Sequence, residues 1–213
     1  MPYSTLDLQA ACEALRDGAT IVFPTESFYA MGCDALNPDA IGAVYAIKQR
    51  PYRLPLPVVI GDRAQLDIIV GEVPPLAVKL MDAFWPGPLS IVLPASPEVP
   101  DLLTSGTGRI AVRLSPHPAV AALCRESGLI LSASSANISG QPPATTPDAL
   151  EPMLLQHVAG VFDLPPLPGG GNPSSIVEIL ADRGEGTVRV LREGGVSLDA
   201  LRSKGFTVVT ADG

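Results

Sequence analysis

Helix-like and strand-like segments alternate along the whole of this sequence, and each of them is short. Apolar residues recur at helical spacing over residues 8–15, and a glycine follows at position 18. The next apolar run, residues 19–23, is typical of a buried strand. The chain carries 23 prolines and 20 glycines without a low-complexity tract, which indicates many tight turns between short elements. Such interleaving favours an α/β fold, and with no internal repeat or linker we expect one domain over residues 1–213.

The same criteria predict the remaining elements. Further helices are expected at residues 37–50, just after residue 62, and at 77–84, 117–124, 146–156 and 197–204. Further strands are expected at residues 56–60, 89–93, 110–114, 129–132, 160–163, 175–180, 187–192 and 206–209. Residues 164–173 read as a loop rich in proline and glycine, whose run of three glycines would permit motion.

The helix predicted over residues 37–50 ends in two cations. Its apolar stripe, which includes Ile41 and Tyr45, has Lys48 as the next member, and Arg50 follows just before a proline. A lysine on a buried stripe and an arginine beside it suggest a site for a polyanion. The simpler interpretation is that Lys48 complements the negative helix C-terminus and extends to water.

Composition excludes several classes of function. With 14 lysines and arginines against 22 aspartates and glutamates, the net charge is −8, which argues against a broad nucleic-acid-binding face but allows a small cationic cleft. The three cysteines fit neither a disulfide framework nor a zinc site, so we expect buried free thiols. No apolar run is long enough to span a bilayer and no leader is evident, so a cytoplasmic location is expected.

Known nucleotide-binding and hydrolase motifs are missing. The sequence has no Walker loop, no dinucleotide-binding fingerprint and only two histidines, of which His117 precedes a proline at a predicted helix start and is interpreted as structural.

What remains is a set of polar residues near strand ends. Alone, each is more often a cap, a turn residue or an ion-pair partner. Together they supply cations, hydroxyls and an amide, which suits a phosphate-bearing ligand and a small polar one without covalent catalysis. These residues are Thr25, Arg113, Ser135, Asn137, Ser174, Ser175, Arg192 and Glu193.

Seven segments in order resemble the YrdC/Sua5 family, and its single-domain members in particular. They cover nearly the whole chain and are Phe23-Pro24-Thr25-Glu26-Ser27-Phe28-Tyr29, Lys48-Gln49-Arg50-Pro51, Trp85-Pro86-Gly87-Pro88, Ala111-Val112-Arg113 with Pro116-His117-Pro118, Ser135-Ala136-Asn137-Ile138-Ser139-Gly140, Ser174-Ser175-Ile176-Val177 and Leu191-Arg192-Glu193-Gly194. The sequence stops soon after residue 192, so the C-terminal domain of longer members is expected to be absent.

The resemblance implies a twisted mixed sheet with flanking helices around a concave, positively charged cleft. It also implies a nucleotidyltransferase that converts L-threonine, bicarbonate or CO2 and ATP into threonylcarbamoyl-adenylate and pyrophosphate. The product would serve the t6A modification of tRNA, with separate transfer proteins accepting the adenylate. No membrane partner is expected, and direct contact with RNA is expected to be weak at most.

The resemblance also assigns residue roles. Lys48 and Arg50 would hold the phosphates as the catalytic cations, with Mg²⁺ carried by ATP rather than by protein ligands. Ser135, Asn137 and Arg192 would complete the ATP site. Thr25, Arg113 and Ser174 would hold L-threonine, with Arg113 on its carboxylate.

Three positions depart from the family pattern. Leu54 stands where a lysine or asparagine is usual, Val59 where some relatives have histidine, and Ala30 where glycine is frequent. Arg53 is next to Leu54, but strand geometry would point its side chain elsewhere. Two other functions are considered. One is a non-catalytic module that binds double-stranded RNA or tRNA. The other is a carbamoyl-adenylate enzyme of the hydrogenase-maturation type, whose usual zinc and acylphosphatase segments this sequence lacks.

Overall fold

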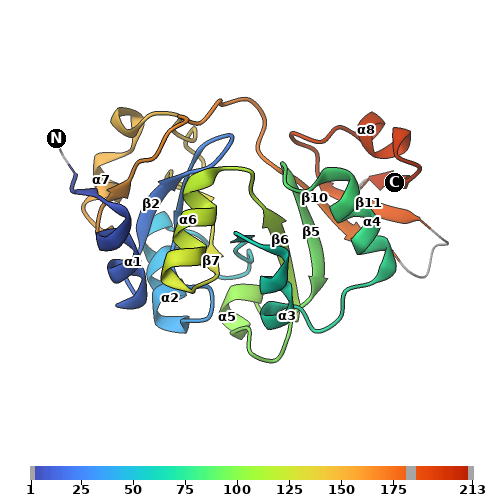
Figure 1. Ribbon diagram of the computed structural model, residues 1–213, viewed down its shortest axis with the longest axis horizontal. Helices are drawn as coiled ribbons and strands as arrows, with labels where there is room; N and C mark the ends of the chain where they lie inside the picture. Colours follow the sequence, from blue (N-terminus) through green and yellow to red (C-terminus); the bar gives the residue numbers. More distant parts are fainter. Residues whose placement is uncertain (1–2, 181–185, 211–213) are drawn as a thin grey trace.

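The computed structural model describes residues 3–180 and 186–210, and its elements alternate as the sequence indicates (Figure 1). Within these residues the α-helices are α1 (Leu8–Arg16), α2 (Pro38–Lys48), α3 (Leu66–Ile69), α4 (Pro75–Phe84), α5 (Asp101–Thr104), α6 (Pro118–Ser127), α7 (Pro152–Leu155) and α8 (Leu198–Ser203), with 3₁₀ turns η1 (Arg63–Gln65) and η2 (Pro147–Ala149). None of these described helices is long and apolar enough to cross a membrane.

The described strands form two mixed sheets. The five-stranded sheet has the order β1 (Thr5–Leu6), β9 (Val161–Phe162), β2 (Ile21–Pro24), β3 (Tyr29–Gly32), β8 (Ser134–Ser135). The seven-stranded sheet has the order β12 (Thr207–Thr210), β11 (Thr187–Arg192), β10 (Ser175–Ile179), β5 (Leu89–Pro94), β6 (Arg109–Leu114), β4 (Val58–Ile60), β7 (Leu131–Ser132). Both contain parallel and antiparallel pairs. The α/β class is therefore confirmed, but the single sheet that we expected is divided in two.

Residues 131–135 join the two sheets. Their first part, β7, pairs with β4 at the edge of the larger sheet, and their last part, β8, pairs with β3 at the edge of the smaller one. Between them, the Ala133 N–H donates to the carbonyl of Pro57 (2.8 Å), and the Ser132 N–H donates to the carbonyl of Cys33 (2.9 Å). One extended segment therefore holds both sheets at a fixed junction.

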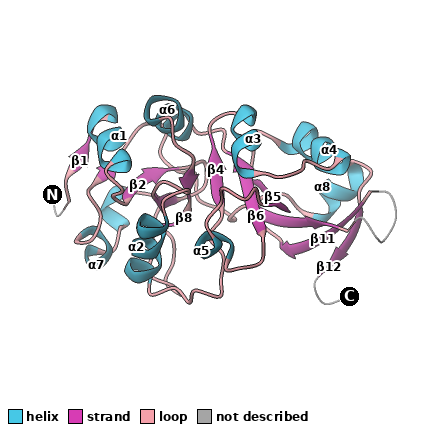
Figure 2. Ribbon diagram, turned by 90° about the horizontal axis from the view of Figure 1, so that it is seen from below, coloured by secondary structure: helices cyan, strands magenta, loops and turns pink. Residues whose placement is uncertain are grey.

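Helices cover the sheets on both sides. In Figure 2, α1, α6, α3 and α4 lie above the strands, and α2, α5 and α7 lie below them. Helix α1 packs on α6, where Ala11 and Leu15 meet Val120 and Leu123 in a small apolar core that also includes Phe23. A larger core fills the other faces.

One expected helix is wrong, and four short elements, β1, β3, α5 and β8, were not predicted. The helix predicted over residues 146–156 is broken into η2 and α7, because Pro152 has no N–H to donate and begins a new helix instead of continuing one. Strand β3 was not predicted, because its short Tyr29–Gly32 sequence is buried throughout and ends in glycine, which strands disfavour.

Candidate functional site

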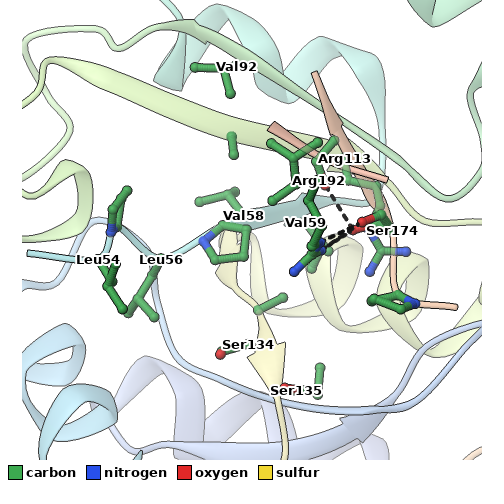
Figure 3. A pocket seen from close by; sticks show the side chains of 18 of the residues that line it. Leu54, Leu56, Val58, Val59, Val92, Arg113, Ser134, Ser135, Ser174 and Arg192 are labelled. Atoms are coloured by element: carbon green, nitrogen blue, oxygen red, sulfur yellow. Dashed lines mark hydrogen bonds between the residues drawn. The ribbon is translucent and has the colours of Figure 1, made fainter. Parts of the chain in front are cut away.

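A pocket of about 480 Å³ lies at the junction of the two sheets (Figure 3). The smaller sheet contributes the turn after β2 and strands β3 and β8, and the larger one contributes β4, β5, β6, β10 and β11. Figure 3 shows an uneven lining, with Leu54 and Leu56 on one side and Arg113, Arg192 and Ser174 on the other. The pocket therefore offers an apolar wall beside a cationic one.

Arg113 supplies the buried part of the cationic wall. It lies in β6, on the same face as Ala111, and both line the pocket as strand alternation predicts. Its side chain is 10% exposed and forms an ion pair through Nη1 with Glu26, whose side chain is 20% exposed. A guanidinium this deeply buried needs such a partner, because an unpaired charge in the interior is costly.

Arg192 lies beside Arg113 in the close-up view and reaches across to β10 (Figure 3). Its Nε and Nη2 donate to the carbonyl of Ser174 (3.0 and 2.7 Å), and Nη2 also donates to the Ser174 hydroxyl (3.2 Å). Burial lowers the pKa of Arg192, and the charges of Arg113 and Arg50 lower it further. This mutual repulsion means that the three guanidiniums share one electrostatic environment that would favour an anion.

Arg50 completes the set from the end of α2. Gln49, in the left-handed region (φ 51°), ends the helix, and the chain turns so that Arg50 faces the pocket. Its Nε donates to the carbonyl of Leu54 (3.1 Å) and its Nη2 to that of Pro55 (3.0 Å). Burial lowers the pKa of this guanidinium.

Lys48 is buried but does not line the pocket. Its side chain enters the protein from the apolar stripe of α2, and Nζ donates to the carbonyls of Ser135 and Asn137, the latter at 2.6 Å. The hydroxyl of Ser139 donates back to the Lys48 carbonyl (3.0 Å). Burial, with a smaller contribution from Arg50, lowers the pKa of Lys48 to about 8. The lysine thus fastens the loop after β8 to the end of α2.

Asn137 sits inside that loop. Its Nδ2 donates to the carbonyls of Ile138 (3.0 Å) and Gln141 (2.6 Å), while its Oδ1 is buried without a hydrogen-bond partner among the described residues. This unpaired acceptor lies in the loop that Lys48 holds behind the pocket.

The predicted residues Thr25 and Ser174 place hydroxyl groups at the pocket. Thr25 is buried in the turn after β2, where its Oγ1 donates to the carbonyl of Phe28 (2.7 Å). Ser174 precedes β10, and its Oγ lies 3.1 Å from the Oγ of the buried Ser90 in β5. Ser90 and Glu26 were not singled out from the sequence. Strand alternation places Ser90 on the side of β5 that lines the pocket, as it does Val92.

Of the eight residues to which the resemblance assigns roles, six line one pocket and the other two lie directly behind it, whereas the other candidates Ser175 and Glu193 do not line it and bind backbone groups of Val196 and Leu198. Those lining the pocket are Thr25, Arg50, Arg113, Ser135, Ser174 and Arg192, and those behind it are Lys48 and Asn137. The departures Leu54, Val59 and Ala30 also line it, whereas Arg53 is exposed and does not. Arg53 points elsewhere as expected, but it lies in a turn before β4 and not in a strand.

His117 and the cysteines lie outside this site. His117 Nδ1 accepts the Ala119 N–H (3.1 Å) as the N-cap of α6, so Nε2 is the nitrogen that donates to the carbonyl of Pro166 (2.8 Å). The structural interpretation of this histidine is confirmed. The three cysteines are buried free thiols, also as expected.

Comparison with known proteins decides the family. The family model Sua5/YciO/YrdC, described as telomere recombination, matches residues 13–194. The chain belongs to the Sua5/YciO/YrdC family. The resemblance seen in the sequence is therefore confirmed.

Curated members of this family are similar over most of the chain. A threonylcarbamoyl-AMP synthase of Bacillus subtilis is 37% identical over 203 residues, which is 94% of this chain and 57% of that protein. One of Xylella fastidiosa strain M23 is 39% identical over 175 residues, which is 81% of this chain and 93% of that protein. The chain thus spans little more than half of the first relative and nearly all of the second.

Among solved structures, P. abyssi Sua5 in complex with L-threonine matches with a TM-score of 0.85 and 27% identity, covering 97% of this chain and 62% of that one. The expected α/β fold of this family is therefore confirmed, with its strands in two sheets.

Proposed function

We propose that this chain is an L-threonylcarbamoyl-adenylate synthase. It would convert L-threonine, bicarbonate or CO2 and ATP into threonylcarbamoyl-AMP and pyrophosphate. Two relatives that match most of the chain carry this activity in their names, and a structural relative was solved with L-threonine.

The observation that carries the proposal is the meeting of Arg50, Arg113 and Arg192 at one pocket in a chain with a net charge of −8. They come from the end of α2, from β6 and from the end of β11. Binding a triphosphate together with a carboxylate needs such a concentration of fixed positive charge, because the net negative charge of the chain would otherwise repel both anions.

The chemistry needs no protein nucleophile. The neutral threonine amine adds to CO2 and releases a proton to solvent, which leaves a carbamate. A carbamate oxygen then forms a bond to the α-phosphorus of ATP while the bond to the β-phosphate oxygen breaks, and pyrophosphate leaves. Because negative charge moves onto the leaving group, catalysis is mainly positioning and charge neutralisation.

In the ATP site, Arg50 binds the phosphates from the pocket wall, and Lys48 acts from behind it. The Lys48 ammonium is bound to the carbonyls of Ser135 and Asn137, so it acts on the phosphates through its charge and by holding Ser135 at the pocket. Ser135, Asn137 and Arg192 complete this site. ATP enters with Mg²⁺ as part of the substrate, and the described residues contain no cluster of three metal-ligating side chains of their own.

L-Threonine occupies the part of the pocket nearest Arg113, Thr25 and Ser174. A guanidinium suits a carboxylate because its planar array of donors matches the two oxygens. The mixed anhydride that forms is an activated acyl group. It is consumed by an acyl transfer, here to tRNA for the t6A modification, which separate proteins carry out.

The test is to incubate the protein with ATP, Mg²⁺, bicarbonate and L-threonine, and to measure pyrophosphate. Release that requires threonine supports the proposal. Binding of tRNA or double-stranded RNA with no release would overturn it in favour of a binding module.

Two variants then test the cations. We expect Lys48→Ala and Arg50→Ala each to lower threonine-dependent release by about 100-fold or more, as when a preorganised donor is removed from an active site. Arg63→Ala is the matched control, because Arg63 forms an exposed ion pair with Asp82 on the surface. Normal turnover in either pocket variant, with the fold intact by circular dichroism, would refute the role of that residue.

A further inference from the structure

The guanidinium of Arg113 is held from outside the pocket. Arg113 lines the cavity, but Glu26, which pairs with its Nη1, does not. Nη1 is therefore committed to the protein. The other N–H groups make no hydrogen bond with any described residue and are left for a ligand. The ion pair joins residues 87 positions apart, from the turn after β2 and from β6.

Glu26 is itself fixed on several sides. The Ser115 hydroxyl donates to its Oε2 (2.8 Å), while Oε1 takes the bond from Arg113. The Gly169 N–H donates to the Glu26 carbonyl (3.0 Å), and the Gly170 N–H donates to the carbonyl of Ser27 (2.9 Å). Both carboxylate oxygens and the backbone are thus occupied, so this turn residue has a defined position from which to orient Arg113.

The Glu26 carboxylate also changes the balance of charge at the cationic wall of the pocket. Arg113 and Arg192 repel each other across the pocket wall, and Glu26 offsets one of their two charges. In the described part of the chain, the charges of Arg192 and Arg50 remain unpaired for the ligand, while Arg113, with its charge offset, keeps its other N–H groups for a carboxylate. A neutral residue at position 26 would leave Arg113 free to rotate away from Arg192.

We propose that Glu26, supported by Ser115, is a positioning residue that sets the orientation of Arg113 for the carboxylate of the amino-acid substrate. This inference rests on the proposed function, in which Arg113 binds that carboxylate. Glu26 acts through Arg113 and does not touch the reacting atoms.

The experiment compares wild type with Glu26→Gln, which keeps the shape of the side chain and removes its charge. We expect KM for L-threonine to rise about tenfold, as when a charge-assisted hydrogen bond is replaced by a neutral one. KM for ATP should stay within about twofold, because Glu26 does not contact the other cations of the pocket. Glu126→Gln is the matched control, since Glu126 pairs with Arg125 on the exposed surface of α6.

A double-variant cycle separates positioning from a general loss of structure. In the Arg113→Lys variant, residue 113 has an ammonium without the planar donor array of a guanidinium, so Glu26 has no such array to orient. Adding Glu26→Gln to that variant should therefore raise KM for threonine much less than it does in wild type. Equal effects in both backgrounds would overturn the inference. So would an unchanged KM in Glu26→Gln, or a lower one, which would mean that Glu26 competes with the substrate.

The two proposals fail in different ways. If wild type neither releases pyrophosphate in response to L-threonine nor binds it by calorimetry, the proposed function is wrong and this inference falls with it. If wild type is active and only the predicted Glu26 effects are missing, the inference alone is wrong.

Discussion

At the scale of single residues, the most informative side chain is Lys48, because it is a cation inside the protein. Its ammonium replaces water with the carbonyls of Ser135 and Asn137, and its pKa falls from 10.5 to about 8 because the charged form is poorly solvated there. The positive charge of Lys48 therefore lies where it can act on a ligand in the adjacent pocket. Burying this charge lowers the folding stability of the protein.

This loss of stability should depend on pH. Below pH 8, Lys48 is protonated in both the folded and the unfolded chain, so the buried charge opposes folding in full. Between pH 8 and 10.5 the folded chain loses this proton first, so its stability rises by at most about 1.4 kcal/mol per pH unit. We expect the difference in unfolding free energy between wild type and Lys48→Met to move in favour of wild type from about pH 7.5 to 9.5 in urea titrations. A constant difference would contradict this assignment.

At the scale of elements, the site depends on close backbone contact between β11 and β10. Gly194 follows β11 and lies against the chain just before β10. An added Cβ would overlap the carbonyl oxygen of Pro173 and come within 2.8 Å of the carbonyl carbon of Ser174. Only glycine allows the loop that carries Ser174 to lie this close to the end of the strand that carries Arg192.

Gly194→Ala should therefore displace Ser174 and lower threonine-dependent turnover by about tenfold or more, because a shift of about 1 Å at a positioning group is costly. Gly42→Ala is the matched control. Gly42 lies inside α2, and its new Cβ would make only an ordinary contact with Leu102 at 3.9 Å. We expect that control to stabilise the protein by about 0.5–1 kcal/mol in urea unfolding. Equal activity in the two variants would contradict the argument.

Local patterns explain which elements could be predicted. Helix α2 was predicted with its N-cap Asn37 and its end near Lys48, because capping, periodicity and the following proline all agree. The division into two sheets could not be predicted, since it depends on residues 131–135 pairing with both β4 and β3, which lie far away in the sequence. The Glu26–Arg113 pair could not be predicted either, because its two residues are also far apart in the sequence. Strand alternation did predict that Arg113 and Ala111 share a face of β6, and this is the face that lines the pocket.

At the scale of the whole molecule, the pocket lies where the two sheets meet, so a ligand bound there contacts both. Thr25 and Ser135 belong to the side of the smaller sheet, and Arg113 and Arg192 to the larger. Binding should therefore stabilise the fold as a unit.

Saturation with ATP, Mg²⁺ and L-threonine should raise the midpoint of thermal unfolding. Ligand at 100 times Kd adds about 2.7 kcal/mol, which corresponds to roughly 5–10 °C for a domain of this size. Scanning fluorimetry measures the shift, and Arg50→Ala should reduce it. An identical midpoint with and without these ligands at millimolar concentrations would argue against the pocket as their site.

The buried cysteines have a practical consequence. Burial raises the pKa of the Cys33 and Cys124 thiols to about 12, and it also raises the pKa of the Cys12 thiol. At neutral pH all three thiols are therefore protonated, and burial shields them from alkylating reagents. Covalent labelling of these sulfurs can then proceed only through molecules whose interior has opened. The labelling rate would therefore report how often the native protein opens transiently, without an engineered probe.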